Sequence, residues 1–152
     1  MKFSTQEEYG LRCLVQIGRH EDGLTIPQIS QLENLSQANV GKLMRILRMG
    51  GFVESLRGQD GGYRLARPAE RIQVGEVLAV LGGRLYTSDF CEKHSGPDQV
   101  CSHTVSSCNV RGLWESVQKA VDRALANVTL RDMLGAKPKP TAGSAIPILY
   151  SN

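Results

Sequence analysis

Three of the four cysteines fall close together in a polar segment of the second half of the chain. Nine residues separate Cys91 from Cys101, six separate Cys101 from Cys108, and His94 and His103 lie among them. Thiolates and imidazoles bind transition metals, and thiols also form redox-active disulfides. The segment therefore predicts a metal site or a redox site, which the rest of the chain has to position.

The composition favours a small protein of the cytoplasm. The chain has 152 residues, of which 41% are hydrophobic, enough for one domain with a helical appendage. No apolar run approaches the ~20 residues of a membrane span, and the N-terminal sequence MKFSTQEEYG lacks the features of a signal peptide. We therefore expect a cytoplasmic protein with no membrane partner. Disulfides are uncommon there, which favours metal binding or redox sensing for the clustered cysteines.

Three helices are predicted in the first 50 residues. Ser4 and Glu7 have the spacing of a capping box, and apolar residues follow at helical spacing to about residue 20. Thr25 and Gln28 repeat this signal before a short helix that ends near residue 34. Ser36 can cap a third helix, which the glycine pair at 50–51 closes.

The third helix has one apolar face and one basic face. Its core-facing stripe is Val40, Leu43, Met44 and Leu47. The opposite face carries small residues followed by cations, namely Ala38, Gly41, Lys42, Arg45 and Arg48. Residues 36–67 contain six basic residues against two acidic ones, and a compact basic surface suits phosphate contacts. An ordinary solvated face has a similar composition.

A glycine-rich hairpin follows the basic helix. Residues 52–56 and 63–66 read as strands joined by the turn RGQDGG. This order predicts a mainly α-helical fold with a β wing, the winged helix-turn-helix. In that geometry the third helix enters the major groove, and Arg57 and Gly58 near the hairpin tip reach the backbone or the minor groove. The alternative is a winged helix that contacts only proteins.

The second half of the chain predicts a dimer. A long amphipathic helix over residues 110–127 carries Leu113, Trp114, Val117 and Val121, and a small winged domain cannot cover such a stripe. A homodimer also suits two recognition helices on a palindrome. The expected organisation is a winged helix-turn-helix domain over 1–67, a connector with a short helix over 68–89, a cluster-binding loop over 90–109, a dimerisation helix with a short terminal helix over 110–134, and a flexible tail over 135–152.

The motifs MKFSTQEEYGLR, SLRGQDGGYRLAR, IQVGEVL and TLRDML, together with the cysteine segment, resemble the Rrf-two family of winged-helix transcription regulators. The resemblance covers residues 1 to about 134, and the family includes IscR-, NsrR- and RirA-like iron–sulfur sensors. It implies a homodimeric regulator, expected to be a repressor, on a palindromic operator in double-stranded DNA. It also implies a 4Fe–4S or 2Fe–2S cluster that responds to redox, iron–sulfur, iron or nitric oxide status, with small oxidants or nitric oxide acting on the cluster.

The resemblance also implies roles for particular residues. The start of the third helix would supply base contacts, from Ser36, Gln37, Ala38, Asn39, Gly41 and Lys42. Arg57 would contact the minor groove. Gly41 stands where IscR-like members carry an acidic residue that influences the DNA they accept, so their operator preference does not transfer to this chain.

The implied cluster ligands are the thiolates of Cys91, Cys101 and Cys108. The spacing of these cysteines departs from the family's usual pattern, and Arg111 stands where IscR-like members use a histidine ligand. Arginine does not ordinarily ligate iron. NsrR-like members use a carboxylate from the first helix, which matches Glu8 here, contributed by the other subunit. The fallback ligands are His94 and His103. Cys13, the fourth cysteine, is expected in the core.

Two further classes of function remain open. The first keeps DNA binding but replaces the cluster with a thiol switch, in which Cys91 and either Cys101 or Cys108 form a disulfide. The second is a structural zinc module or electron carrier without a DNA role. No nucleophile–base constellation or phosphate-binding glycine loop is evident, so we do not expect an enzyme.

Overall fold

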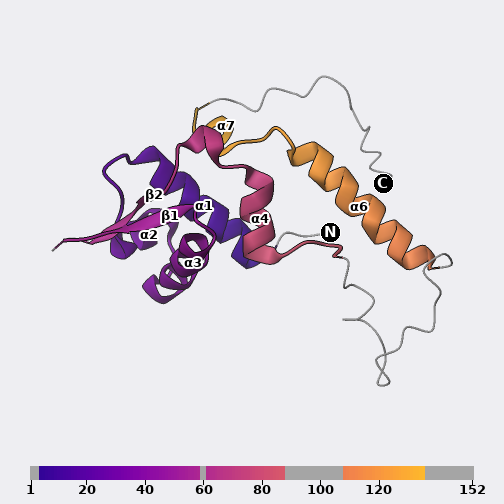
Figure 1. The fold of residues 1–152 in the computed structure, drawn as a ribbon. Helices are drawn as coiled ribbons and strands as arrows, with labels where there is room; N and C mark the ends of the chain where they lie inside the picture. The colour runs from indigo at the N-terminus through magenta and orange to yellow at the C-terminus, as the bar shows by residue number, and fades with distance from the viewer. Residues whose placement is uncertain (1–3, 59–60, 88–107, 136–152) are drawn as a thin grey trace, which may run out of the picture.

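The computed structural model describes residues 4–58, 61–87 and 108–135. It consists of helices and a two-stranded sheet that extends to the left of the helices in Figure 1. The elements run in the order α1 (Thr5–Arg19), α2 (Ile26–Glu33), α3 (Gln37–Met49), β1 (Val53–Leu56), β2 (Gly62–Leu65), the 3-10 helix η1 (Ala69–Arg71), α4 (Val74–Gly82), α6 (Asn109–Leu125) and α7 (Leu130–Gly135). The predicted mainly helical fold with a β wing is confirmed. Within the described ranges, no helix is long and apolar enough to cross a membrane.

The first three helices begin at the predicted caps. The Ser4 and Thr25 side chains each accept a hydrogen bond from the backbone three residues on, and Glu7 and Gln28 complete the two capping boxes. Ser36 Oγ accepts a hydrogen bond from the Asn39 N–H at 3.2 Å and caps α3. These local hydrogen bonds satisfy N–H groups that a helix start leaves free, so they set where each helix begins.

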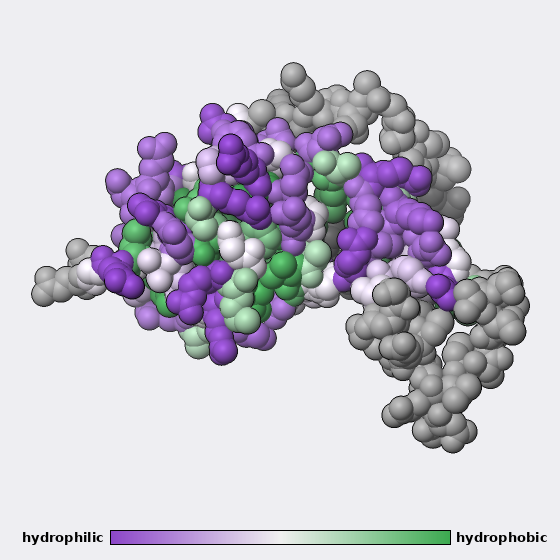
Figure 2. All heavy atoms as spheres, viewed as in Figure 1, coloured by the Kyte–Doolittle hydropathy of each residue, from purple (hydrophilic) through white to green (hydrophobic). Residues whose placement is uncertain are grey.

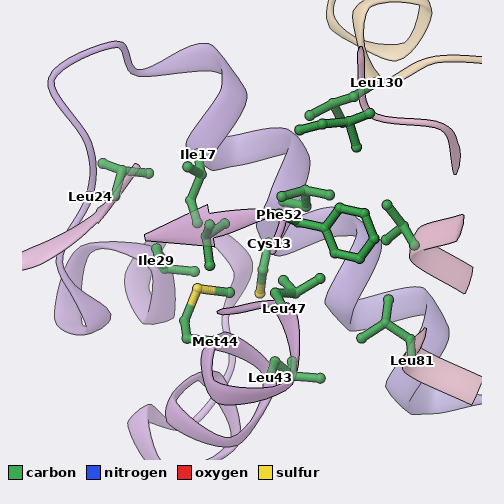
Figure 3. Packing of buried hydrophobic residues seen from close by; sticks show 14 of the residues in the cluster. Cys13, Ile17, Leu24, Ile29, Leu43, Met44, Leu47, Phe52, Leu81 and Leu130 are labelled. Atoms are coloured by element: carbon green, nitrogen blue, oxygen red, sulfur yellow. The ribbon is translucent and has the colours of Figure 1, made fainter. Parts of the chain in front are cut away.

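The core lies where α1, α3, α4 and the start of the sheet meet. Cys13 and Ile17 from α1, Met44 and Leu47 from α3, and Phe52 before β1 are all buried (Figure 3). They come from the apolar stripes of amphipathic helices, so burying them removes one face of each helix from water. The expectation that Cys13 is a core residue is confirmed.

The wing is an antiparallel pair in which Val53 faces Leu65 and Leu56 faces Gly62. Each strand starts one residue away from the predicted position: β1 starts at Val53, after the buried Phe52, and β2 starts at Gly62. The wing is tied to the segment before α2 by two backbone hydrogen bonds between Leu24 and Tyr63, at 2.8 and 2.9 Å.

The last two helices differ in how they meet the winged domain. α7 returns to α1, where Leu130 is buried and Leu134 packs on the core. The Thr129 hydroxyl accepts a hydrogen bond from the Asp132 N–H at 3.4 Å and so caps the start of α7. In contrast, α6 stands away from the first three helices, and among the described elements it packs mainly beside α4 (Figure 1).

Candidate nucleic-acid interface and cysteine segment

The recognition helix α3 is held by its apolar face and presents its basic face to solvent. Val40, Leu43, Met44 and Leu47 are buried as predicted. The residues predicted to contact DNA lie on the other side: Ser36, Gln37, Ala38, Lys42, Arg45 and Arg48 are exposed, and Asn39 and Gly41 are half-buried. The structure thus gathers these residues on one accessible surface, with the cap at Ser36 fixing the helix start.

Ion pairs divide the basic residues of this region into two groups. Arg64 pairs with Glu54 across the wing at 2.7 Å, and Arg67 pairs with Glu76 at 3.0 Å. Within the described part of the chain, no ion pair involves Lys42, Arg45, Arg48 or Arg57. The positive charge left for phosphate groups therefore lies on α3 and at the end of β1. The sequence alone does not show which of the six cations form ion pairs.

The wing carries Arg57 and Gly58 at its outer end, where both are exposed. Gly62 has φ +139°, and a side chain there would place Cβ 2.9 Å from the Leu24 carbonyl oxygen. Glycine is therefore required where the wing crosses the segment before α2. Residues 59 and 60, at the tip of the predicted turn, lie outside the described residues.

A buried carboxylate, which no local sequence pattern indicates, ties α1 to the helix-turn-helix. Glu33, the last residue of α2, is only 7% exposed and accepts hydrogen bonds at 2.6 Å from Arg12 Nε and from Gln16 Nε2. The hydrogen bond and charge of Glu33 raise the pKa of the Arg12 guanidinium. Asn34 follows with φ +53° and begins the turn into α3. The hydrogen bonds of Glu33 to Arg12 and Gln16 therefore hold the end of α2, from which the chain turns into α3.

Most of the predicted cluster ligands cannot be placed. Cys91, Cys101, His94 and His103 lie outside the described residues, as do the cluster-binding loop and the tail except for residues 108, 109 and 135. Cys108 is described: its thiol is half-buried and free, and it immediately precedes α6. Among the described side chains, no group of three or more potential metal ligands gathers.

The segment leading into the unplaced cysteines is clamped to α6. Gln118 is 7% exposed, and its Oε1 accepts hydrogen bonds from the Leu85 N–H at 2.7 Å and the Tyr86 N–H at 3.3 Å. Asp122 pairs with Arg84 at 2.5 Å and accepts a hydrogen bond from Gln118. Since Cys108 immediately precedes α6, this helix is attached to both described flanks of the cysteine segment.

Arg111, at the position of the family's histidine ligand, is also engaged with that segment. Its Nε donates a hydrogen bond to the Tyr86 hydroxyl at 2.9 Å, and its guanidinium carbon lies 6.0 Å from the centre of the Tyr86 ring. Arg111 therefore holds Tyr86 in the segment that leads to the cysteines. This is a structural role, and arginine does not ordinarily bind iron.

Glu7 and Glu8 differ in what their carboxylates do at the start of α1. Glu7 Oε2 accepts a hydrogen bond from the Ser4 N–H at 2.7 Å, and its side chain lies against Gly82. The neighbouring Gln6 donates to the Leu81 carbonyl oxygen, which also joins α1 to α4. Glu8 is exposed. Of the two, Glu8 has the carboxylate available to another surface.

The helix-turn-helix and its hairpin wing define the class of winged-helix DNA-binding proteins. Within that class, residues 3–136 match the model of the Rrf2 family, described as an iron-dependent transcriptional regulator. The chain belongs to the Rrf2 family and is a DNA-binding transcription regulator. This membership also confirms the expectation that it is not an enzyme.

Relatives of two kinds resemble the chain closely. Protein rrf2 of Nitratidesulfovibrio vulgaris is 34% identical over 136 residues, which cover 88% of this chain and 87% of that protein. The structure of T. potens IscR is 29% identical, with TM-score 0.68 over 88% of this chain and 86% of its own. The oxidised form of Staphylococcus aureus CymR is also 29% identical, with TM-score 0.66 over 91% of this chain and 100% of its own. The chain therefore resembles both an IscR and a CymR, and family membership alone does not show by which chemistry it senses a signal.

Proposed function

We propose that this chain is a homodimeric repressor of the cytoplasm that senses redox, iron or nitric oxide status through an iron–sulfur cluster. The observation that carries the proposal is the pair of anchors on α6: Gln118 clamps residues 85–86, and Cys108 begins the helix. A segment with three cysteines is thereby attached to the helix that also carries an uncovered apolar surface. Cluster binding or oxidation at the cysteines would therefore act through α6 on its exposed apolar surface.

The second subunit is proposed to cover the apolar stripe of α6. Val110 is 59% exposed and Leu113 is 60% exposed, which is costly for side chains of this size. The face of α6 visible in Figure 2 is largely hydrophilic, so the helix is amphipathic. A second copy, related by two-fold symmetry, buries identical stripes against each other and presents two α3 helices to a palindromic operator.

The donor set fits an iron–sulfur cluster. Cys91, Cys101 and Cys108 would supply three thiolates, and Glu8 of the second subunit would supply the fourth ligand. Cys108 has a free thiol and Glu8 an exposed carboxylate, so both are available. When bound, the cluster would supply a centre that oxidants or nitric oxide can attack at its weakest ligand.

Anaerobic purification tests the cluster. The wild-type protein should be brown, with visible absorption and bound iron and sulfide, and Cys101→Ala should be colourless. Cys13→Ala is the matched control, because Cys13 is buried in the core and should not contribute a ligand. Colourless wild-type protein with stoichiometric zinc would contradict the cluster.

A thiol switch is the second candidate, favoured by the likeness to a CymR crystallised in an oxidised form. In this case the two thiols of Cys91 and of Cys101 or Cys108 would lose two electrons and two protons to an oxidant such as hydrogen peroxide and form a disulfide. Cluster-free protein should then change its DNA affinity on treatment with peroxide and regain it with a dithiol. A response that requires bound iron excludes this alternative.

The DNA-binding face is tested with two arginines in different environments. Arg45→Ala should weaken binding to an operator duplex and lower the salt dependence of affinity by about one counterion, because an unpaired cation is lost. Arg64→Ala is the matched control, since Glu54 already neutralises Arg64. Equal losses in the two variants would contradict the assignment of the face to α3.

A further inference from the structure

A groove lies between α4 and α6, and α4 separates it from the recognition helix (Figure 1). Its volume is about 200 Å³. At one end Gly75 of α4 lies against Leu125 of α6. At the other end Gly82 of α4 lies against Glu7 of α1. The groove therefore follows the length of α4 on the side that faces α6.

The wall of the groove is mainly apolar. Leu78 and Ala79 line it from α4, and Val121 lines it from α6. These three side chains are half-buried, and none of them belongs to the core of the winged domain. Leu85, at the edge of the groove, is 38% exposed. Apolar side chains of this kind gain free energy when another apolar surface removes them from water.

The polar side chains on the lining already bind one another or the backbone. Gln118 donates a hydrogen bond to Asp122 at 2.9 Å, and Asp122 pairs with Arg84. Glu7 accepts a hydrogen bond from the Ser4 N–H at 2.7 Å. Because these polar groups have partners, the surface left to bind an occupant is apolar.

The last part of the chain contains an apolar segment. Residues 145–150 read AIPILY, whereas the preceding residues 136–144 read AKPKPTAGS and have no large apolar side chain. Pro147 favours an extended conformation for the residue before it, which suits a chain lying along a groove. The segment thus has the chemistry that the groove lacks an occupant for, and it is tethered to the same fold.

The connector over residues 136–144 is long enough to reach the groove. It starts after Gly135, the end of α7, where Leu134 lies against Gly18 of α1. Glu7, at the far end of the groove, is eleven residues earlier in α1, which is about 17 Å along the helix axis. An extended, proline-containing connector of this length spans roughly 30 Å. Tethering also gives the segment an effective concentration of about 1 mM or more, so weak apolar contacts suffice for docking.

We propose that residues 145–150 dock in the groove between α4 and α6 of the same chain and brace α6 against α4. The predicted flexible tail would then be limited to the connector. Bracing matters because α6 also holds, through Gln118, the segment that leads to the cysteines. The docked segment adds a further tie between that helix and the winged domain, whichever chemistry the cysteines use.

Photocrosslinking of the full-length protein tests where the segment lies. Tyr150 is replaced by the photoreactive amino acid p-benzoylphenylalanine, which keeps an aromatic ring at this position. Irradiation should give cross-links to Leu78, Val121 or Leu125, identified by mass spectrometry, in a product that migrates as a single chain on a denaturing gel. The same replacement at Thr141, in the connector, is the control and should not cross-link to these residues.

Filling the groove tests the same contact from the other side. Ala79→Phe places a ring in the groove and should lower the yield of the Tyr150 cross-link at least about tenfold. Val80→Phe is the matched control, because Val80 is the next residue of α4, is 41% exposed and does not line the groove. It should leave the yield unchanged. The positions of the cross-links decide the question even where Ala79→Phe is unstable.

Three results would overturn the proposal. Cross-links from position 150 that lie outside the groove, or none at all, would show that the segment does not dock there. A cross-linked product with the mass of two chains would place the segment on the other subunit. Dissociation of the dimer by Ala79→Phe, measured by analytical ultracentrifugation, would assign the groove to the subunit interface. None of these measurements depends on DNA binding or on the cluster, so their failure is distinct from a failure of the proposed function.

Discussion

Leu47 and Leu113 belong to two similar apolar stripes with opposite fates. On α3, Leu47 is completely buried against α1 and the start of the sheet. On α6, Leu113 is 60% exposed. The two thiols of these regions differ in the same sense, since Cys13 is buried in the winged domain and Cys108 is accessible at the start of α6.

The difference shows which apolar surfaces a single chain covers by itself. The winged domain covers its own apolar surface and fixes its helix starts with local hydrogen bonds. An amphipathic helix that leaves large apolar side chains in water is completed by another surface. The winged domain therefore accounts for the buried core, and assembly and sensing by the region around α6 are what we propose.

The largest expected effect comes from shortening one leucine in each region. Leu47→Ala should lower the free energy of unfolding by about 2–5 kcal/mol, because it leaves a cavity in a packed core. Leu113→Ala should change the folding of the winged domain by less than about 0.5 kcal/mol, because its side chain is largely in water. It should instead weaken the dimer about tenfold.

Urea unfolding and analytical ultracentrifugation at several protein concentrations measure these two effects. If Leu113→Ala leaves the dimer intact, the exposed stripe of α6 is not the interface. If Leu47→Ala costs less than about 1 kcal/mol, the core is less tightly packed than the structure indicates.

Cysteine reactivity gives the next largest contrast. Burial, with a smaller contribution from Glu33, raises the pKa of the Cys13 thiol to about 11, so it is hardly ionised near neutral pH. Alkylation of reduced, cluster-free protein near pH 8 should therefore modify Cys108 at least about 100-fold faster than Cys13. Mass spectrometry of the alkylated peptides measures both rates. Comparable rates would mean that the winged domain opens as readily as the region around α6.

Replacing the buried carboxylate should have an intermediate effect. Glu33→Gln removes the charge that accepts hydrogen bonds from Arg12 and Gln16, and we expect a loss of about 1–3 kcal/mol. The lower end is expected because the Arg12 side chain is 46% exposed and water screens its charge. The DNA affinity should also fall, since α3 departs from this point.

The matched control for Glu33 is Glu54→Gln, which breaks an exposed pair with Arg64. Chemical unfolding should show a change within about 0.5 kcal/mol for this variant. Equal losses at Glu33 and Glu54 would show that burial of Glu33 adds nothing to its ion pair.

The smallest expected effect concerns the cap of α7. Hydrogen bonds from the Thr129 N–H and hydroxyl lower the pKa of Asp132 below its usual value. A lowered folded-state pKa stabilises the protein above the unfolded-state value, about 4, and this stabilisation is lost as the pH falls through the folded-state pKa. Asp132→Asn should lower the melting temperature by about 2 °C at pH 7. A difference from wild type that persists in strong acid would contradict this cause.

Much of the winged domain follows from short-range patterns. The caps at Ser4, Thr25 and Ser36, the stripe of α3 and the hairpin strands all lie where the sequence predicts them, within one residue at strand ends. The ligand roles of Cys91 and Cys101 stay predictions, because these residues lie outside the described chain. The contributions of Glu8 and of the DNA-contacting residues also stay predictions.

Helix starts and apolar faces can be predicted from the sequence, because caps and periodicity depend on residues within a few positions of one another. Which charged side chains form ion pairs depends on the tertiary structure. Glu33 meets Arg12 from 21 residues away, and Gln118 meets Leu85 from 33 residues away. The energy of such contacts depends on the distance and water access that packing creates, and no local pattern contains either. The same packing explains Gly10, Gly18 and Gly82 by close contacts between elements that are distant in the sequence.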